Sequence, residues 1–333
     1  MSLQTEGKLL PKILVLDVGS DWVLETLVRE PRRVHALLDA GSGRFPEIAV
    51  GLADRLSRRW LKRHDAQSLD EIDRIAARVG RPGAYFLNVS YEWGCTCRVA
   101  PASDGGSARL LRVLDWPDLG LGRNIIAVRV ASPVGRWLTL TWPGYTGVLQ
   151  AVAPGRFAAA LNQAPMDAAT GVFPIDWLIA RAQIWRRPYA PAAHLLRRVF
   201  ETAKDFSEAR RLLIETPIAA SAIFSLAGIR SPETCVIQRR PNDAHVIDGP
   251  AVAANVWHGT SWTGRARGEA NADRLEAMRH ARTALDARFA WLRPPIMNER
   301  TRLAFIADAK TGDFLAQGFE PEGPATAVLR ADA

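Results

Sequence analysis

The sequence predicts a layered α+β fold, in which sheets pack against helices. Three observations lead to this prediction. The first 94 residues have a mainly helical pattern, the segment after them reads as a series of short apolar strands, and helical and strand patterns then alternate to the end. With 333 residues, 48% of them hydrophobic, the chain can build one large domain or two modest ones.

An amphipathic helix is predicted within the first 94 residues. Apolar side chains recur there every four residues opposite a row of basic ones; the apolar set is Ile48, Leu52, Leu56 and Trp60, and the basic set is Arg55, Arg59, Lys62 and Arg63. A helix that covers a core has this pattern, and so does a helix that lies on an anionic membrane. We interpret the apolar stripe as core-facing, with membrane docking as the alternative.

Two strands and a second helix complete the prediction for this region. The apolar run from Ile13 to Leu16 reads as a strand. The helix is predicted from Ser68 to Val79, with Ser68 as its N-cap, Glu71 at the capping-box position and a cluster of Gly and Pro at its end. A strand from Ala84 to Ser90 then leads to the segment that begins at residue 95.

Short strands dominate the pattern from residue 95 onward. Runs rich in apolar and β-branched residues lie near 95–100, 109–114, 124–131, 136–142, 147–152 and 156–161. Two or three helices are predicted between residues 174 and 215. Further strands are expected near 218–226, 234–238, 245–247 and 251–256, then a helix over 271–289 and a strand pair around Leu303 and Phe314. The Ala- and Gly-rich tail from Gly318 reads as a solvated terminus.

The charge of the chain is strongly basic. A net charge of +8 and a pI near 9.9 suit a nucleic acid or an anionic membrane surface as partner. However, only five of the 43 basic residues are Lys, and the Arg residues are scattered along the whole chain instead of forming one basic arm. We therefore expect no nucleic-acid partner and keep peripheral membrane contact as an alternative.

Hydropathy and cysteine usage bear on the compartment. No apolar run resembles a secretion signal, and none reaches the roughly 18 to 20 residues that cross a bilayer. The three cysteines, Cys95, Cys97 and Cys235, are a small and odd number that suits a reducing compartment better than a disulfide framework. A cytoplasmic protein is the expectation.

The residues that can carry chemistry lie in one predicted hairpin. Strand alternation puts Cys95 and Cys97 on one face, and a turn at 104–107 brings Arg112 and Asp115 back toward the start of the first strand. The thiolate is the nucleophilic form of cysteine, so Arg112 is expected to lower the pKa of the Cys95 thiol. The alternative is a buried structural thiol beside a surface Arg–Asp pair.

The same segment fits self-cleavage before Cys95. Gly94 lacks a Cβ, which permits the strained backbone that an attacking side chain requires. The freed α-amine, with an ordinary pKa of about 7.7 to 8.0, can shuttle the thiol proton, and Asp115 can hold the resulting ammonium. A zinc site at Cys-X-Cys is not expected, because no nearby Cys or His completes a set of four ligands.

A family resemblance emerges from these residues. Cys95-Thr-Cys-Arg-Val, followed by Arg112-Val-Leu-Asp115-Trp, resembles the nucleophile region of the acid ceramidase, N-acylethanolamine acid amidase and bile salt hydrolase group of N-terminal-nucleophile hydrolases. Cys95, Arg112 and Asp115 match the nucleophile, Arg and Asp of that group. The likeness continues in the group's order and covers most of residues 84–280; its further segments are 142–149, 154–157, 221–224 and 235–239.

The resemblance implies three more site residues. Asn255 resembles the asparagine whose amide helps to form the oxyanion hole. Asn162 resembles a polar position that flanks the site in bile salt hydrolases. Arg274 resembles a basic residue downstream of the oxyanion asparagine.

The chain departs from the group at two positions. Gln163 stands where ceramidase-like members have Glu, which puts the proton-transfer or self-cleavage role of that Glu in question. Cys97 stands where relatives have Ser or Gly, and it is the other candidate nucleophile. The preceding Gly94 and the following Thr96 favour Cys95.

The fold and activity that the resemblance implies are specific. The fold is the four-layer αββα sandwich, with residues 1–94 as a helical pro-segment that stays as a smaller subunit and 95–333 as the catalytic subunit. The enzyme hydrolyses the linear amide bond of an N-acyl amide, similar to a ceramide, an N-acylethanolamine or a conjugated bile acid, through a Cys95 thioester and without a cofactor. A scaffold protein that retained the fold and an acyltransferase that uses the same thioester are the alternatives. The oligomeric state is left open.

Overall fold

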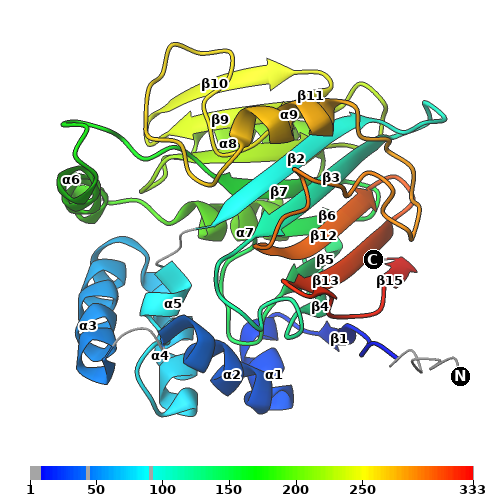
Figure 1. The fold of residues 1–333 in the computed structure, drawn as a ribbon. Helices are drawn as coiled ribbons and strands as arrows, with labels where there is room; N and C mark the ends of the chain where they lie inside the picture. The colour runs from blue at the N-terminus through cyan, green and yellow to red at the C-terminus, as the bar shows by residue number, and fades with distance from the viewer. Residues whose placement is uncertain (1–8, 43–45, 90–92, 333) are drawn as a thin grey trace, which may run out of the picture.

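Two facing sheets form the centre of the molecule, and helices cover their outer sides (Figure 1). The computed structural model describes residues 9–42, 46–89 and 93–332. The larger sheet contains, in spatial order, β1 (Leu14–Val18), β4 (Ile126–Ser132), β5 (Gly135–Thr141), β6 (Gln150–Ala153), β7 (Phe157–Gln163), β8 (Ala222–Ala227), β9 (Thr234–Arg240) and β10 (Asp243–Asp248). This arrangement confirms the predicted α+β sandwich.

The smaller sheet carries the segment that the sequence singled out. Its strands are, in spatial order, β11 (Ala251–Ala253), β2 (Gly94–Pro101), β3 (Ala108–Asp115), β12 (Thr301–Asp308), β13 (Asp313–Glu320) and β14 (Gly323–Pro324), and β15 (Leu329–Asp332) also pairs with β13. All of its described pairings are antiparallel. In the larger sheet, β1 and β4 are parallel, so the N-terminal region adds an edge strand to the main body.

The helices fall into two groups. The N-terminal group contains α1 (Trp22–Arg29), α2 (Pro31–Ser42), α3 (Glu47–His64), α4 (Ala66–Val79) and α5 (Phe86–Val89), which gather on one side of the sandwich (Figure 1). The second group contains α6 (Phe173–Arg186), α7 (Ala192–Thr202), α8 (Phe206–Glu215) and α9 (Asn271–Arg279). Helices α7 and α8 pack on the larger sheet, and α9 packs on β2 and β11 of the smaller one.

The main core lies between the two sheets. Side chains from the smaller sheet, such as Val99 and Leu110, and from the larger sheet, such as Ala160 and Phe224, have no exposed surface there. Complete burial of a large apolar side chain contributes about 1.5 to 3 kcal/mol to folding. Cys95 belongs to the same core, so the candidate nucleophile sits inside the sandwich.

The strand predicted from Ala84 to Ser90 is wrong over residues 84–89, and Ser90 lies outside the described residues. The chain forms the short helix α5 instead, after a turn in which Gly83 has a φ of 122°. The Asp54 carboxylate accepts the backbone N–H groups of Gly83, at 2.7 Å, and of Phe86, at 2.8 Å. A carboxylate from a helix distant in sequence therefore caps this turn. The alternation of apolar and polar residues near 84–90 cannot predict such a contact.

The amphipathic helix exists as α3, but the face predicted to cover the core is wrong. Ile48 is 88% exposed, Leu52 57% and Leu56 37%, whereas Asp54 and Leu61 are buried. The Asp54 carboxylate explains this orientation. Because it caps the turn before α5, the face of α3 that carries Asp54 points inward and the apolar stripe points outward. Only Trp60 of the predicted stripe is buried.

Helix α4 has a different cap from the predicted one. Asp65, not Ser68, caps its N-terminus, and the Asp65 carboxylate accepts the backbone N–H of Ser68. Glu71 forms an ion pair with Arg197 of α7 instead of closing a capping box. The acidic residue is therefore used in tertiary contact between the N-terminal helices and the main body.

Two predictions near the C-terminus also need correction. The helix predicted over 271–289 ends at Arg279, and the chain runs irregularly until β12. The tail from Gly318 is not a solvated terminus, since it completes β13 and then forms β14 and β15. The pairing of β15 with β13 supplies the hydrogen bonds that keep this tail in the sheet.

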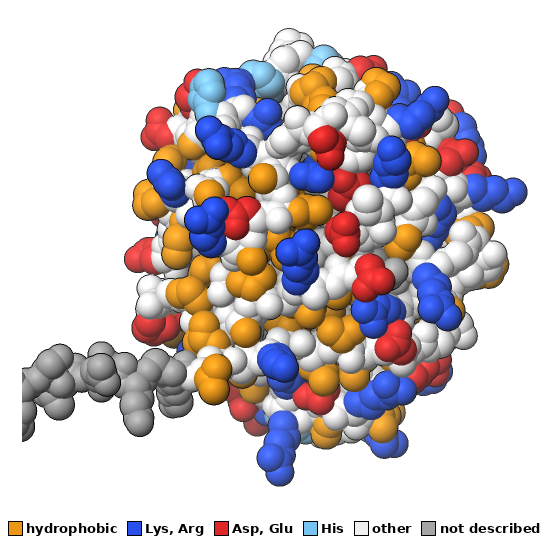
Figure 2. Space-filling view, turned by 90° about the vertical axis from the view of Figure 1, so that its right-hand side faces the viewer, with side chains coloured by type: hydrophobic (Ala, Val, Ile, Leu, Met, Phe, Trp, Pro, Cys, Tyr) orange, Lys and Arg blue, Asp and Glu red, His pale blue; other side chains and the backbone are white. Residues whose placement is uncertain are grey.

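The surface carries mixed charge. On the face shown in Figure 2, Lys and Arg side chains lie among Asp and Glu side chains and do not form one continuous basic patch. No helix in the described ranges has the length and apolar character needed to cross a membrane.

Candidate active site

The β2–β3 hairpin brings the predicted residues together. Its register pairs Gly94 with Asp115 and Cys97 with Arg112, while Cys95 lies opposite Leu114. The hairpin turns at the polar residues 102–107, as the turn signals predict. A thiol, a guanidinium and a carboxylate are thereby placed at one end of a buried strand pair.

Arg112 joins the two thiols at the centre of the site. Its Nη2 donates to Cys95 Sγ at 3.0 Å. Its Nη1 donates to Asn162 Oδ1 at 3.0 Å and lies 3.5 Å from Cys97 Sγ. The guanidinium has no exposed surface. A planar fork suits this position because its two nitrogens can bind two different partners at once.

The Cys95 thiol has no exposed surface. Complete burial raises the pKa of Cys95 to about 12, and the nearby Arg112 charge acts in the opposite direction without outweighing burial. Arg112 thus lowers the pKa of Cys95, as expected, but burial raises it by more, so the net shift is upward. A reactive thiolate requires that Cys95 gain access to water or to a base.

Asn255 holds the nitrogen of Cys95. Its Oδ1 accepts the Cys95 backbone N–H at 2.7 Å, and its Nδ2 donates to the Gln163 carbonyl at 2.8 Å. The oxygen of this amide, not its NH₂ group, therefore faces the peptide bond between Gly94 and Cys95. The oxyanion role that the resemblance implies needs the NH₂ group to leave Gln163.

Arg274 and Asp115 form a buried pair beside the peptide bond between Gly94 and Cys95. Arg274 Nη1 donates to the Cys95 carbonyl at 3.0 Å and to Asp115 Oδ2 at 3.3 Å. Burial raises the pKa of Asp115, and the Arg274 charge opposes that shift. Asp115 lies against Gly94, where a Cβ would come within 3.3 Å of the Asp115 Cβ. With Gly94 and Cys95 joined, the Cys95 backbone N–H donates to Asn255. The contact of Asp115 with a freed ammonium stays a prediction.

Asn162 and Gln163 complete the inner wall of the site. Asn162 Oδ1 accepts from Cys97 Sγ at 3.0 Å, and its Nδ2 reaches the carbonyls of Ala253 and Ala254, each at 3.3 Å. Gln163 Oε1 accepts the backbone N–H of Trp93 at 3.0 Å. Gln163 thus holds the chain two residues before Cys95, and its amide does not titrate.

Two residues of this network were missed by the sequence analysis. Thr301 donates to Asp115 Oδ1 at 3.0 Å, and no local pattern connects positions so far apart in the chain. Asn271 Oδ1 accepts from Arg274 Nη2 at 2.9 Å and from the Asn255 backbone N–H at 3.0 Å. Its position three residues before Arg274 on a predicted helix was a usable signal.

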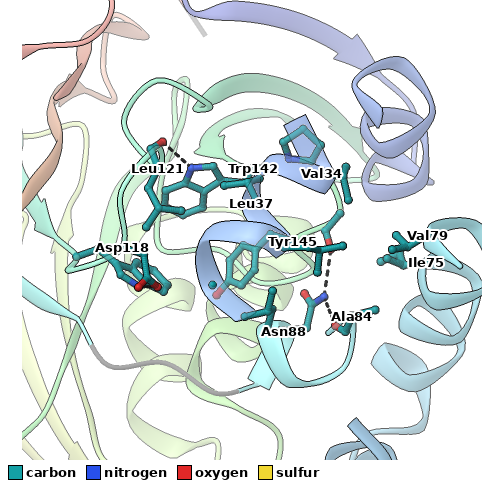
Figure 3. A pocket seen from close by; sticks show the side chains of 16 residues that line it. Val34, Leu37, Ile75, Val79, Ala84, Asn88, Asp118, Leu121, Trp142 and Tyr145 are labelled. Atoms are coloured by element: carbon teal, nitrogen blue, oxygen red, sulfur yellow. Dashed lines mark hydrogen bonds between the residues drawn. The ribbon is translucent and has the colours of Figure 1, made fainter. Parts of the chain in front are cut away.

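An apolar cavity of about 90 Å³ lies next to this network (Figure 3). Its wall combines side chains of α2 and α4 with the loops that follow β3 and β5; they include Val34, Leu37, Ile75, Val79, Trp116, Leu121, Trp142 and Tyr145. Trp116 directly follows Asp115 and stacks on Trp93 with ring centroids 5.3 Å apart. The cavity therefore opens beside the residues that flank Cys95.

The described part of the chain contains no cluster of three or more His, Cys, Asp or Glu residues suited to a metal ion. The site instead consists of a buried thiol that follows a glycine at the start of a strand, with Arg, Asp and Asn side chains around it. Together with the two facing sheets and their outer helices, this arrangement defines an N-terminal-nucleophile hydrolase fold.

Known proteins support this class. No protein-family model matches the chain. Acid ceramidase from Homo sapiens is 32% identical over 100 residues, which are 30% of this chain and 24% of the relative. Acid ceramidase from Heterocephalus glaber is 30% identical over 105 residues, or 31% of this chain and 25% of the relative. The chain thus spans about a quarter of the length of these relatives.

A solved structure matches over a larger part of the fold. The N-acylethanolamine-hydrolyzing acid amidase ortholog from Caenorhabditis elegans superposes with a TM-score of 0.51 and 21% identity, over 71% of this chain and 100% of that one. The chain therefore has the fold of this amidase and is similar in sequence to acid ceramidases over about a third of its own length.

Proposed function

We propose that this chain is a cysteine amidase that hydrolyses the linear amide bond of an N-acyl amide through a thioester at Cys95. The observation that carries the proposal is the buried contact of Arg112 with the Cys95 thiol, at 3.0 Å, on a strand whose preceding residue is glycine. The Caenorhabditis elegans neighbour is named for the hydrolysis of N-acylethanolamines, which are N-acyl amides, and this is the same reaction class.

Activation begins with cleavage of the bond between Gly94 and Cys95. The freed α-amine of Cys95 then takes the thiol proton, and the thiolate attacks the amide carbonyl carbon of the substrate. The Sγ–C bond forms, the C–N bond breaks, and the proton passes to the leaving amine. Water cleaves the thioester, which releases the carboxylic acid and returns a proton to Sγ.

The N-terminal region stays bound after the cut as the smaller subunit, residues 1–94. Strand β1 is hydrogen-bonded to β4 of the larger sheet. Asp65 contacts His194 of α7 at 2.8 Å, and Glu71 pairs with Arg197 of the same helix. These contacts do not depend on the peptide bond before Cys95, so residues 95–333 keep the helices that form half of the apolar cavity.

The apolar cavity takes the acyl group of the substrate in this proposal. Its wall is almost entirely hydrophobic and begins at Trp116, the neighbour of Asp115. Pockets lined mainly by hydrophobic side chains suit hydrophobic ligands. Activity against a series of N-acyl amides of increasing acyl length tests the substrate class. The proposal requires release of a carboxylic acid, with a preference for apolar acyl groups.

Val79→Trp should reduce hydrolysis of long-chain substrates more than that of short-chain ones. Val79 is half-buried in the cavity wall, so an indole at this position occupies space that a long chain needs. We expect a loss of roughly 10-fold or more in kcat/KM for the longest substrate. The matched control is Ala77→Trp, on the exposed side of the same helix. An equal loss on all chain lengths would contradict this placement of the acyl group.

The orientation of two helices supports peripheral contact with an anionic membrane as part of this proposal. The α3–α6 face, defined here by Ile48, Leu52 and Leu56 of α3 with Phe173, Ile175, Trp177, Leu178 and Trp185 of α6, exposes 37% or more of each side chain. Trp60 Nε1 donates to the Ile184 carbonyl at 3.2 Å, which joins the two helices. Basic residues flank the apolar stripe of α3, as an anionic surface requires.

Leu52→Glu combined with Leu178→Glu should weaken vesicle binding about 10-fold or more, because each change puts a charge where an apolar side chain enters the lipid. Co-sedimentation with vesicles of phosphatidylserine and phosphatidylcholine measures this. Val28→Glu on α1, where Val28 is 51% exposed, is the control and should bind like the wild type. Wild-type protein that stays in the supernatant would refute the membrane contact.

Two features of the proposal concern the acyl acceptor and the compartment. An acyltransferase would pass the thioester to an amine instead of water, and product analysis with added amines separates the two reactions. The cytoplasm remains the proposed location, since all three cysteines are free thiols.

A further inference from the structure

Strand β10, strand β11 and helix α9 lie together at one edge of the sandwich (Figure 1). Residues of this region line a second cavity. Its volume is about 210 Å³. Arg98 of β2, Arg279 of α9 and His258 line it together with apolar residues of the β10–β11 connection. Arg98 lies next to Cys97 on β2 but points to the opposite face of the strand, so this cavity is separate from the site around Cys95.

The charge in this cavity is one-sided. No Asp or Glu stands among its described lining residues, which include two guanidinium groups. Arg98 Nη1 donates to the Met278 carbonyl at 2.9 Å, but the buried Arg98 Nε has no partner in the described part of the chain. Burial lowers the pKa of Arg98, and no carboxylate acts against that shift. A partly buried cation without a counter-charge is costly, and a bound anion removes that cost.

Arg279 differs from Arg98 in its surroundings. It is 45% exposed in its side chain and pairs with Glu276 at 2.7 Å outside the cavity wall. An exposed pair of this kind is weak and exchanges readily with other anions. Arg279 can therefore turn one face of its guanidinium to a ligand at the mouth of the cavity, while Arg98 holds the ligand further in.

We propose that this cavity is a binding site for a small oxyanion, held by the guanidinium groups of Arg98 and Arg279. Guanidinium forks match the geometry of carboxylate and phosphate oxygens. The rest of the wall, formed by Ile247, Pro250 and Val252, accepts a short apolar group attached to the anion. Phosphate and a short-chain carboxylate share the chemistry that the site recognises, and the experiment separates them.

The test is thermal unfolding of the full chain titrated with inorganic phosphate or with butyrate, at constant ionic strength set with sodium chloride. We expect a saturable rise in Tm of about 1 to 3 °C with at least one of the two anions. Arg98→Gln should abolish the rise. Arg136→Gln, which removes an exposed cation elsewhere, should leave it unchanged.

Arg279→Gln provides a second variant in case Arg98→Gln fails to fold, and it should weaken the response to the anion at least several-fold. No saturable response to either anion in the wild-type protein overturns the proposal. The proposal is also overturned if Arg98→Gln responds to the anion as strongly as the wild type does. If only Arg279→Gln folds, the same response in that variant overturns it. Because the readout is binding, its failure is distinguishable from a failure of the amidase activity.

Discussion

Cys95→Ala should abolish both self-cleavage and amide hydrolysis. Without Sγ the chain cannot attack the bond after Gly94, and no thioester can form on a substrate. Removal of a covalent nucleophile reduces turnover by roughly 10⁴-fold or more. Intact mass of the purified protein, with N-terminal identification of each fragment, checks the first effect. Fragments that meet at Gly94 and Cys95 should appear only in the wild type.

Cys97→Ala is the matched control for this experiment. Cys97 lies on the same face of β2, is equally buried and also contacts the Arg112 guanidinium. We expect this variant to be cut, because its thiol is bonded to Asn162 and does not neighbour the scissile bond. If Cys95→Ala is still cut and Cys97→Ala is not, the nucleophile is Cys97. An uncut wild type whose Cys95 resists alkylation would favour a scaffold protein.

Asn255→Ala should reduce turnover by roughly 100- to 1000-fold, the effect of losing one oxyanion donor. The same change removes the acceptor that holds the Cys95 nitrogen at 2.7 Å, so self-cleavage should slow as well. Asn255 is fully buried, and Tm should therefore be measured beside the rates to separate lost chemistry from lost folding. Steady-state kinetics on the fully cut protein gives the turnover effect by itself.

Asn255→Asp separates the two roles of this side chain. A carboxylate keeps an oxygen for the Cys95 N–H but cannot donate to an oxyanion or to the Gln163 carbonyl. We expect this variant to retain more self-cleavage than Asn255→Ala while its turnover stays as low. If both variants turn over substrate at the wild-type rate, Asn255 is not the oxyanion donor. Donors would then have to come from the backbone around Cys95.

The reactive hairpin was predictable because all of its information is local. Alternation places Cys95 and Cys97 on one face, the polar turn sets the register, and the register pairs Cys97 with Arg112. The remaining site residues come from other strands and from α9, and only the family resemblance indicated them. Asn162, Asn255 and Arg274 all contact the hairpin in the structure. Thr301 could not be predicted, because no residue near it in sequence indicates its hydrogen bond to Asp115.

The sequence alone therefore determined the class of fold, the order of most strands and helices, and the residues of the hairpin. These depend on periodicity and turn chemistry, which act over a few neighbouring residues. Tertiary structure decided which way each element faces. Asp54 caps the turn before α5, so α3 buries this carboxylate and exposes its apolar stripe. Burial, which sums over the whole surroundings of a group, reversed the expected pKa shift of Cys95.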